Sequence, residues 1–155
     1  VAPYADRLAE ALSDEDEVTR QWAAEALTNL AVLSGTRPGV GELLSHPDRE
    51  VRRRVAETLG HLPRSASLPA LALAAAESPP AARKRALSLL REMGCDTSPE
   101  SLGSLCEARG IVLLESGDFQ LARRYLEAAR DYYLEAGDSE SAERVSSLLG
   151  EAPGG

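Results

Sequence analysis

The stretch SHPDREVRRRVAETLGHL, Ser45–Leu62, decides the fold because it combines the start of a helix with a helical apolar stripe. His46 stands where this helix is expected to begin, and Pro47 follows at the first helical position, where a missing N–H does no harm. The apolar residues recur at the spacing of one helix face: Val51, Val55, Leu59 and Leu62.

The same pattern occurs three times along the chain. Residues 12–30, 44–62 and 76–93 align, and Arg20, Arg52 and Arg83 occupy equivalent places that are 32 and 31 residues apart. A period of this size predicts a stacked array of helix pairs. We expect pairs at 3–32, 38–62 and 66–93, a hairpin at 99–135 and a last helix at 138–150.

The shared pattern, L-x-D/H-x-D-x-x-V-R-x-x-A-A-x-A-L-x-x-L, resembles the short HEAT repeat of the phycobilisome-lyase type over residues 5–94. The resemblance implies a right-handed α–α superhelix whose second helices line a concave face, where partners dock. It does not imply lyase activity, because most such repeats are binding scaffolds.

Residues 99–150 resemble a tetratricopeptide repeat followed by a lone capping helix. The signature positions are Gly110, Gly117, Asp118, Phe119, Ala122, Leu126 and Ala129. Tyr125, Tyr132 and Tyr133 are expected to help pack the capping helix. The predicted organisation is HEAT-like repeats in 1–94, a tetratricopeptide-like hairpin with its cap in 95–150 and a disordered tail in 151–155. Together they form one all-α, right-handed solenoid of about nine antiparallel helices.

Composition narrows the classes of partner. The formal net charge is −8 and the pI is near 4.8, which argues against general nucleic-acid binding. No apolar run is long enough for a membrane span and no signal peptide is visible, so a cytoplasmic protein without a membrane partner is expected. The first residue is Val1, not Met, which is compatible with a piece of a longer protein.

No pattern for catalysis or metal binding emerges. His46 and His61 lack the spacing of a zinc site, and Cys95 and Cys106 are predicted to be reduced thiols. The acidic run at 14–17 is explained by the dipole at a helix start. We therefore expect no catalytic residue, no metal and no cofactor.

The repeated arginines have a structural interpretation. The HEAT resemblance implies that the arginine of each copy bonds an aspartate near the start of the second helix and ties neighbouring repeats together. The residues assigned this role are Arg20, Arg52, Arg83, Asp16 and Asp48. Arg83 is expected to lack such a partner, because Pro79 or Pro80 replaces the aspartate in the third copy.

The next two positions of each copy are candidates for partner binding. Trp22, Arg53, Arg54, Lys84 and Arg85 would form a basic patch with an aromatic edge on the concave face. A solvated helix face explains the same residues, and both interpretations stay open. The predicted function is a non-catalytic protein–protein scaffold or adaptor that binds an acidic protein segment. The alternatives are a lyase-like or assembly-chaperone subunit and a self-associating, homo-oligomeric repeat domain.

Overall fold

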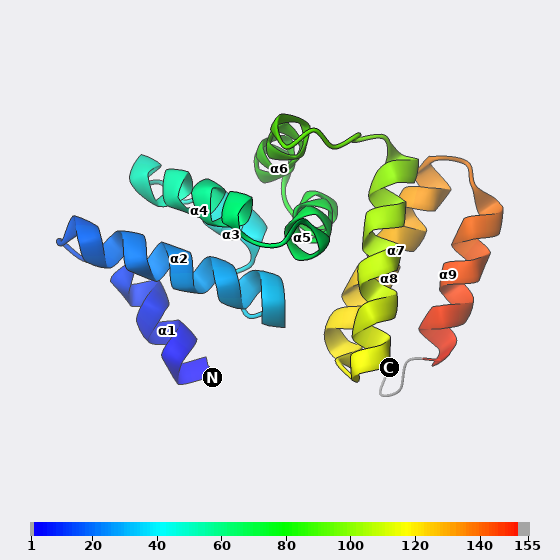
Figure 1. Cartoon of the computed structure of the whole chain (residues 1–155), viewed down its shortest axis with the longest axis horizontal. Coiled ribbons are helices and arrows are strands. Elements are labelled where there is room, and N and C mark those ends of the chain that lie inside the picture. The colour runs from blue at the N-terminus through cyan, green and yellow to red at the C-terminus, as the bar shows by residue number, and fades with distance from the viewer. Residues whose placement is uncertain (1, 152–155) are drawn as a thin grey trace.

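The computed structural model describes residues 2–151, which form nine helices and no strand. The helices are α1 (Ala2–Ala11), α2 (Glu17–Ser34), α3 (Val40–Leu44), α4 (Arg49–His61), α5 (Arg64–Glu77), α6 (Pro80–Glu92), α7 (Pro99–Ser116), α8 (Phe119–Glu135) and α9 (Ser139–Glu151). They follow one another as antiparallel pairs and a final helix (Figure 1). The predicted all-α fold class is confirmed. Glu151 ends α9, and the rest of the expected tail lies outside the described residues.

Helix α4 begins slightly later than the sequence predicted. Asp48, not His46, is the N-cap of α4, and its carboxylate accepts a hydrogen bond from the Glu50 backbone N–H at 2.9 Å. His46 Nδ1 accepts instead from the Asp48 N–H at 3.1 Å, in the loop before the helix. Aspartate in an extended conformation is a better N-cap than histidine, which explains the shift.

The core follows the predicted stripe. Val51, Val55 and Leu59 are fully buried, and Leu27 and Leu90 are buried at equivalent places of the other two copies. α5 differs because every residue from Ala66 to Ala75 is buried. A helix that is apolar all round must lie inside the molecule, and α5 contacts α3 and α6 as well as α7 and α8.

The array changes direction at α5. α2 and α4 run side by side, whereas α5 and α6 are seen nearly end-on in the same view (Figure 1). α6 packs mainly on α5 and on the short α3. The third pair therefore does not continue the row of α2 and α4.

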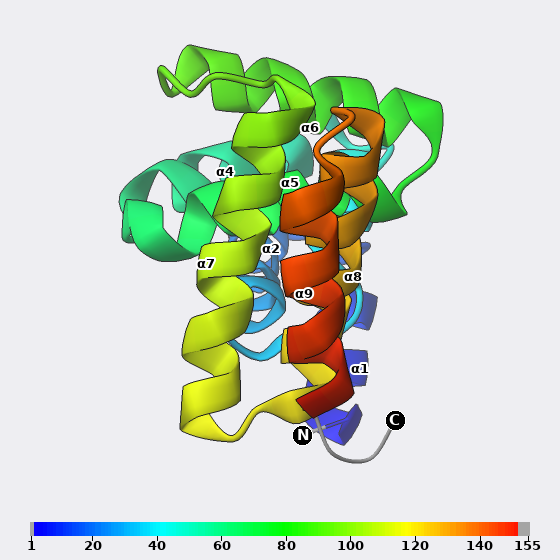
Figure 2. The same ribbon diagram turned by 90° about the vertical axis from the view of Figure 1, so that its right-hand side faces the viewer.

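The C-terminal part is an antiparallel α7–α8 hairpin with α9 packed on α8 (Figure 2). Two glycines of α7 permit the close approach of α8. A Cβ at Gly103 would lie 2.9 Å from the Tyr133 ring, and one at Gly110 would lie 2.6 Å from the Leu126 side chain. Small residues at these two places therefore set the spacing of the hairpin.

Polar bonds hold α9 against the hairpin. Arg144 Nε and Nη2 each donate to the Glu107 carboxylate at 2.8 Å, and the Tyr133 hydroxyl donates to it at 2.7 Å. The hydrogen bonds from Arg144 and then from Tyr133 lower the pKa of Glu107, although burial opposes them. Tyr132 differs from the sequence-based expectation, because its hydroxyl donates to the Ala72 carbonyl on α5 at 2.7 Å.

Arg124 of α8 joins the hairpin to the first repeats. Its Nε and Nη2 donate to the Glu77 carboxylate at 3.1 and 2.7 Å, and its Nη1 donates to the Gly35 carbonyl at 3.3 Å. Gly35 ends α2 with a φ of 68°, a conformation that favours glycine, and a Cβ there would lie 2.7 Å from Leu121 of α8. The N-terminal and C-terminal helices are thus in direct contact.

Candidate functional site

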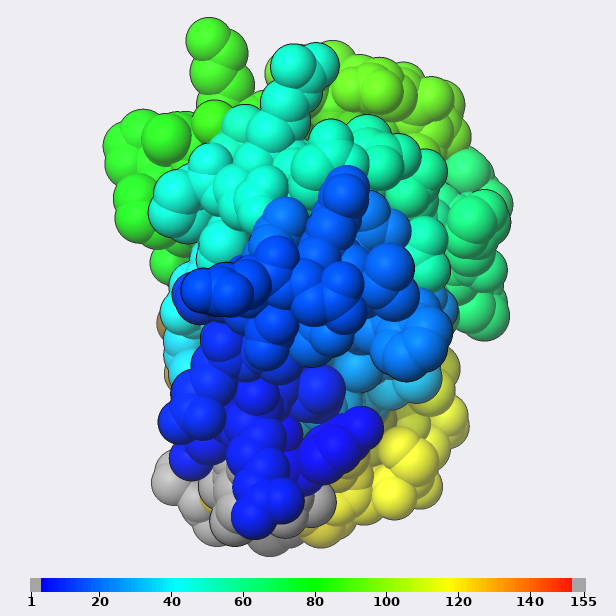
Figure 3. Space-filling model, turned by 90° about the vertical axis from the view of Figure 1, so that its left-hand side faces the viewer, coloured from blue at the N-terminus to red at the C-terminus, as the bar shows by residue number. Residues whose placement is uncertain are grey.

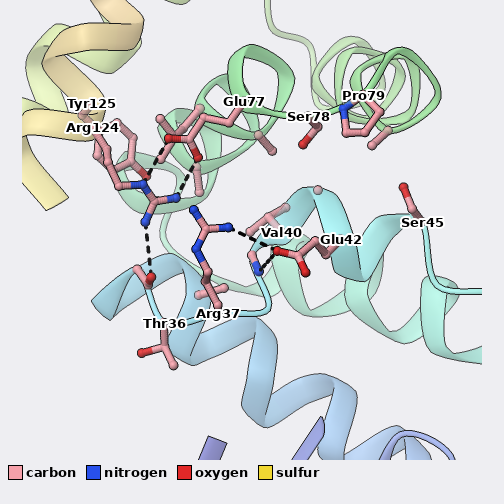
Figure 4. A pocket seen from close by; sticks show the side chains of 18 residues that line it. Thr36, Arg37, Val40, Glu42, Ser45, Glu77, Ser78, Pro79, Arg124 and Tyr125 are labelled. Carbon is pink, nitrogen blue, oxygen red and sulfur yellow. Dashed lines mark hydrogen bonds and ion pairs between the residues drawn. The ribbon is translucent and has the colours of Figure 1, made fainter. Parts of the chain in front are cut away.

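Four surfaces are candidates for function: a cavity at the joint of the array, the solvent-exposed face of α2 and α4, the cations of α6, and a groove between α5 and α7. The cavity is the most enclosed of them. It measures about 200 Å³ and lies between the α2–α3 connection, α3, α5 and α8 (Figure 4). Its charged groups already have partners: Arg37 pairs with Glu42 at 3.4 Å, and Arg124 pairs with Glu77. The cavity is therefore explained as part of the joint.

The solvent-exposed face of α2 and α4 carries the most exposed aromatic side chain of the described residues. Trp22 is 69% exposed, and two shallow depressions that share Glu25 and Asn29 extend from Trp22 along α2 to His61 on α4. Figure 3 looks onto the end of the array to which α1 and α2 belong. Large aromatic side chains are normally buried, so this exposure needs an explanation.

The two candidate arginines of α4 are already neutralised by carboxylates. Arg53 pairs with Glu50 and Glu57 of its own helix at 2.7 and 3.3 Å. Arg54 reaches across to Glu25 of α2 at 2.6 Å and approaches Glu57 at 3.9 Å. Positively and negatively charged side chains therefore alternate on this face beside Trp22.

The two candidate cations of α6 lie on a helix that is not aligned with α4. Arg85 Nη1 donates to the Leu44 carbonyl at the end of α3 at 2.9 Å. Lys84 is exposed and forms no ion pair with residues 2–151. The five candidate residues therefore do not form one free basic patch, because the array turns between α4 and α6 and three of the four cations have partners.

The repeated arginines bind the loops before their helices. Arg20 Nη1 donates to the Asp14 and Glu15 carbonyls at 2.7 and 3.0 Å. Its Nε also lies 3.0 Å from an oxygen of Asp48 in the following repeat. Asp16 accepts from Thr19 instead, at 2.8 Å. The ion pair between repeats is therefore Arg20 with Asp48, whereas Asp16 accepts its hydrogen bond within the first turn of its own helix, α2.

The other two arginines of this series lack an aspartate partner among the described residues. Arg52 Nη1 donates to the His46 and Pro47 carbonyls at 2.6 and 3.0 Å, and the third copy offers no carboxylate at the Asp48 position. Arg83 lies 3.9 Å from Glu135 of α8. Of the arginine–aspartate contacts that were expected to tie neighbouring repeats together, the described residues form one, between Arg20 and Asp48.

A larger open groove, the α5/α7 groove, was not anticipated from the sequence. It has a volume of about 930 Å³ and is bounded by the first turns of α5, the α6–α7 connection and one face of α7. Its apolar lining comprises Leu68, Pro69, Leu105, Ala108 and Val112, and its charged lining comprises Arg64, Asp96, Glu100 and Arg109. Val112 is 49% exposed at its rim.

The thiols and histidines offer no reactive arrangement in the described part of the chain. Cys106 is fully buried, and burial raises the pKa of its thiol; burial also raises the pKa of Cys95. A thiol with a raised pKa is a poor nucleophile. No group of His, Cys, Asp and Glu within residues 2–151 is arranged to hold a metal ion. The described helices include none long and apolar enough to cross a membrane.

Antiparallel helix pairs stacked in chain order define an α-helical repeat protein. The model of the family described as HEAT repeats matches residues 5–91 and, in a second register, residues 36–110. The chain therefore belongs to the HEAT-repeat family. No curated protein and no solved structure shows a significant match to it.

Proposed function

We propose that this protein is a non-catalytic scaffold for protein–protein interaction and that the face of α2 and α4 around Trp22 contacts the partner. The proposal rests on the exposure of Trp22, which is the one tryptophan of the chain and is 69% exposed on a repeat helix. Tryptophan is enriched among the residues that dominate binding energy at interfaces. Membership of the HEAT-repeat family supports the same class of function.

The surroundings of Trp22 suit a partner with an apolar anchor. Glu25 and Asn29 lie beside it on α2, and these side chains supply hydrogen-bonding groups at the rim of such a contact. Binding of an acidic segment here would have to displace Glu25 from Arg54, or Glu50 and Glu57 from Arg53. The acidic segment is therefore better sought at a cation without a partner.

We also propose that residues 99–150 form a tetratricopeptide-like hairpin with a capping helix. The close approach of α7 and α8 at Gly103 and Gly110 favours a tetratricopeptide-like hairpin in 99–150. A lyase-like or assembly-chaperone role has no specific observation in its favour. Self-association through the same face is tested together with the main proposal.

The test is affinity capture from cells that produce the protein, with Trp22→Ala compared with wild type. Leu134→Ala is the matched control, because Leu134 is an exposed apolar residue of α8 at 57% exposure. We expect Trp22→Ala to lose at least one partner that both wild type and Leu134→Ala retain. Equal recovery by all three forms would refute the role of Trp22. Sedimentation that shows a Trp22-dependent dimer would assign the face to self-association.

A further inference from the structure

The α5/α7 groove has the side-chain spacing of a helix-pairing seam. Ser101, Leu105, Ala108 and Val112 line it from α7 and are separated by four, three and four residues. This is the spacing of the a and d positions of a heptad, which packs best against a second helix lying alongside. Ala108 is exposed and Val112 is half-exposed, whereas Ser101 and Leu105 are half-buried, so the seam is most open toward the C-terminal end of α7.

Arg109 stands beside the seam, at the position that follows Ala108 in the heptad. Its side chain is half-buried, and its Nε is screened from solvent and has no hydrogen-bond partner. Among residues 2–151 no carboxylate forms an ion pair with its guanidinium group. In paired helices this position forms ion pairs with the facing helix, so Arg109 is suited to a carboxylate supplied from outside.

The other charges of the groove do not satisfy Arg109. Asp96 accepts from the Ser98 N–H at 3.1 Å and from the Ser101 hydroxyl at 2.9 Å, at the start of α7. Glu100 and Arg64 lie toward the same end as Asp96, one on the first turn of α7 and the other at the start of α5. That end is therefore mixed in charge, whereas at the other end Arg109 has no ion-pair partner among residues 2–151.

We infer that the α5/α7 groove binds an amphipathic helix of another protein, with aliphatic residues in the seam and a carboxylate on Arg109. The inference rests on the proposed scaffold function and names a second contact surface for it. Ser98 and Val112 are 14 residues apart, which is about 21 Å along a helix. A helix of four turns therefore covers the groove.

The test selects displayed random 16-residue peptides on the wild-type protein and measures their binding by fluorescence anisotropy. We expect the recovered peptides to carry aliphatic residues at heptad spacing and at least one Asp or Glu. Replacing that acid by Lys should weaken binding about tenfold or more, as expected for loss of a hydrogen bond to a charged group. In Arg109→Gln the preference for Glu over Gln should vanish, whereas in Arg49→Gln, a change on α4 outside the groove, it should persist.

Two further variants test the seam itself. Ala108→Glu puts a charge into the groove at an exposed helical position, and Val112→Asp does so at its rim; each should weaken peptide binding about tenfold or more. Ile111→Asp is the matched control, because Ile111 neighbours Val112 but does not line the groove. Thermal melts establish that each variant folds.

Several results would overturn the inference. These are failure to recover any peptide, binding that Ala108→Glu leaves intact, and equal affinity for Glu and Lys peptides. A wild-type dimer that Ala108→Glu dissociates would assign the groove to a second copy of this chain. The scaffold function is judged separately, because Trp22 lies on α2, outside the groove.

Discussion

Replacement of Leu59 by Ala tests the packing of the repeat at its centre. Leu59 is 0% exposed on the apolar stripe of α4, so the change removes three buried carbon atoms. At about 0.8 kcal/mol for each buried carbon, the lost transfer free energy is about 2.4 kcal/mol. The cavity adds to this, because helices in a packed core relax only partly, and the expected total is about 2.5–5 kcal/mol.

The assay is urea unfolding followed by far-ultraviolet circular dichroism, with Leu33→Ala as the control. Leu33 is 49% exposed near the end of α2, and its replacement should change the free energy of unfolding by less than about 0.5 kcal/mol. A loss below about 0.5 kcal/mol for Leu59→Ala would mean that Leu59 is not buried in the core and that the repeat register is wrong.

Three further predictions concern the joint and the cap. Gly41→Ala should destabilise the protein by about 1–3 kcal/mol in the same urea assay, because its Cβ would collide with Ser78. Gly60→Ala, by contrast, places its Cβ in open space within α4 and should stabilise the protein by up to about 1 kcal/mol. Arg124→Gln should cost about 1–2 kcal/mol, measured in the same way, because α8 loses its ion pair to α5 and a bond to the α2 terminus. The pKa of Glu107 is lowered in the folded state. Glu107 therefore stabilises the fold above its unfolded pKa of about 4.3, and this stabilisation is lost as pH falls through its folded pKa. Acid titration of stability should show this loss in wild type and not in Glu107→Gln.

The helix pairs were predictable because the local signals agree with the packing. Apolar residues at helical spacing, such as Val51, Val55 and Leu59, mark the buried face whatever the neighbouring repeat does. Gly35 likewise marks the end of α2, because its left-handed conformation favours glycine. These features depend on residues close in sequence.

The candidate site was less predictable because it depends on how the repeats are oriented. The sequence left open whether Arg54 belongs to a basic patch or to a solvated helix face, because its partner Glu25 is 29 residues away on α2. The turn of the array at α5 also separates α4 from Lys84. The α5/α7 groove arises from the same turn. The heptad spacing around Ala108 was visible in the sequence, but nothing local indicates that this face of α7 is left without a covering helix.

The most direct test of the scaffold function uses Trp22 as a probe, because no other tryptophan contributes to the fluorescence of this chain. A partner recovered by affinity capture, or a tryptophan-free fragment of it, is titrated into the protein while the Trp22 emission is recorded. Burial of an exposed indole at an interface should shift the emission to shorter wavelength in proportion to the complex formed. Complex formation on gel filtration with no change in the Trp22 emission would contradict the proposal that this face contacts the partner.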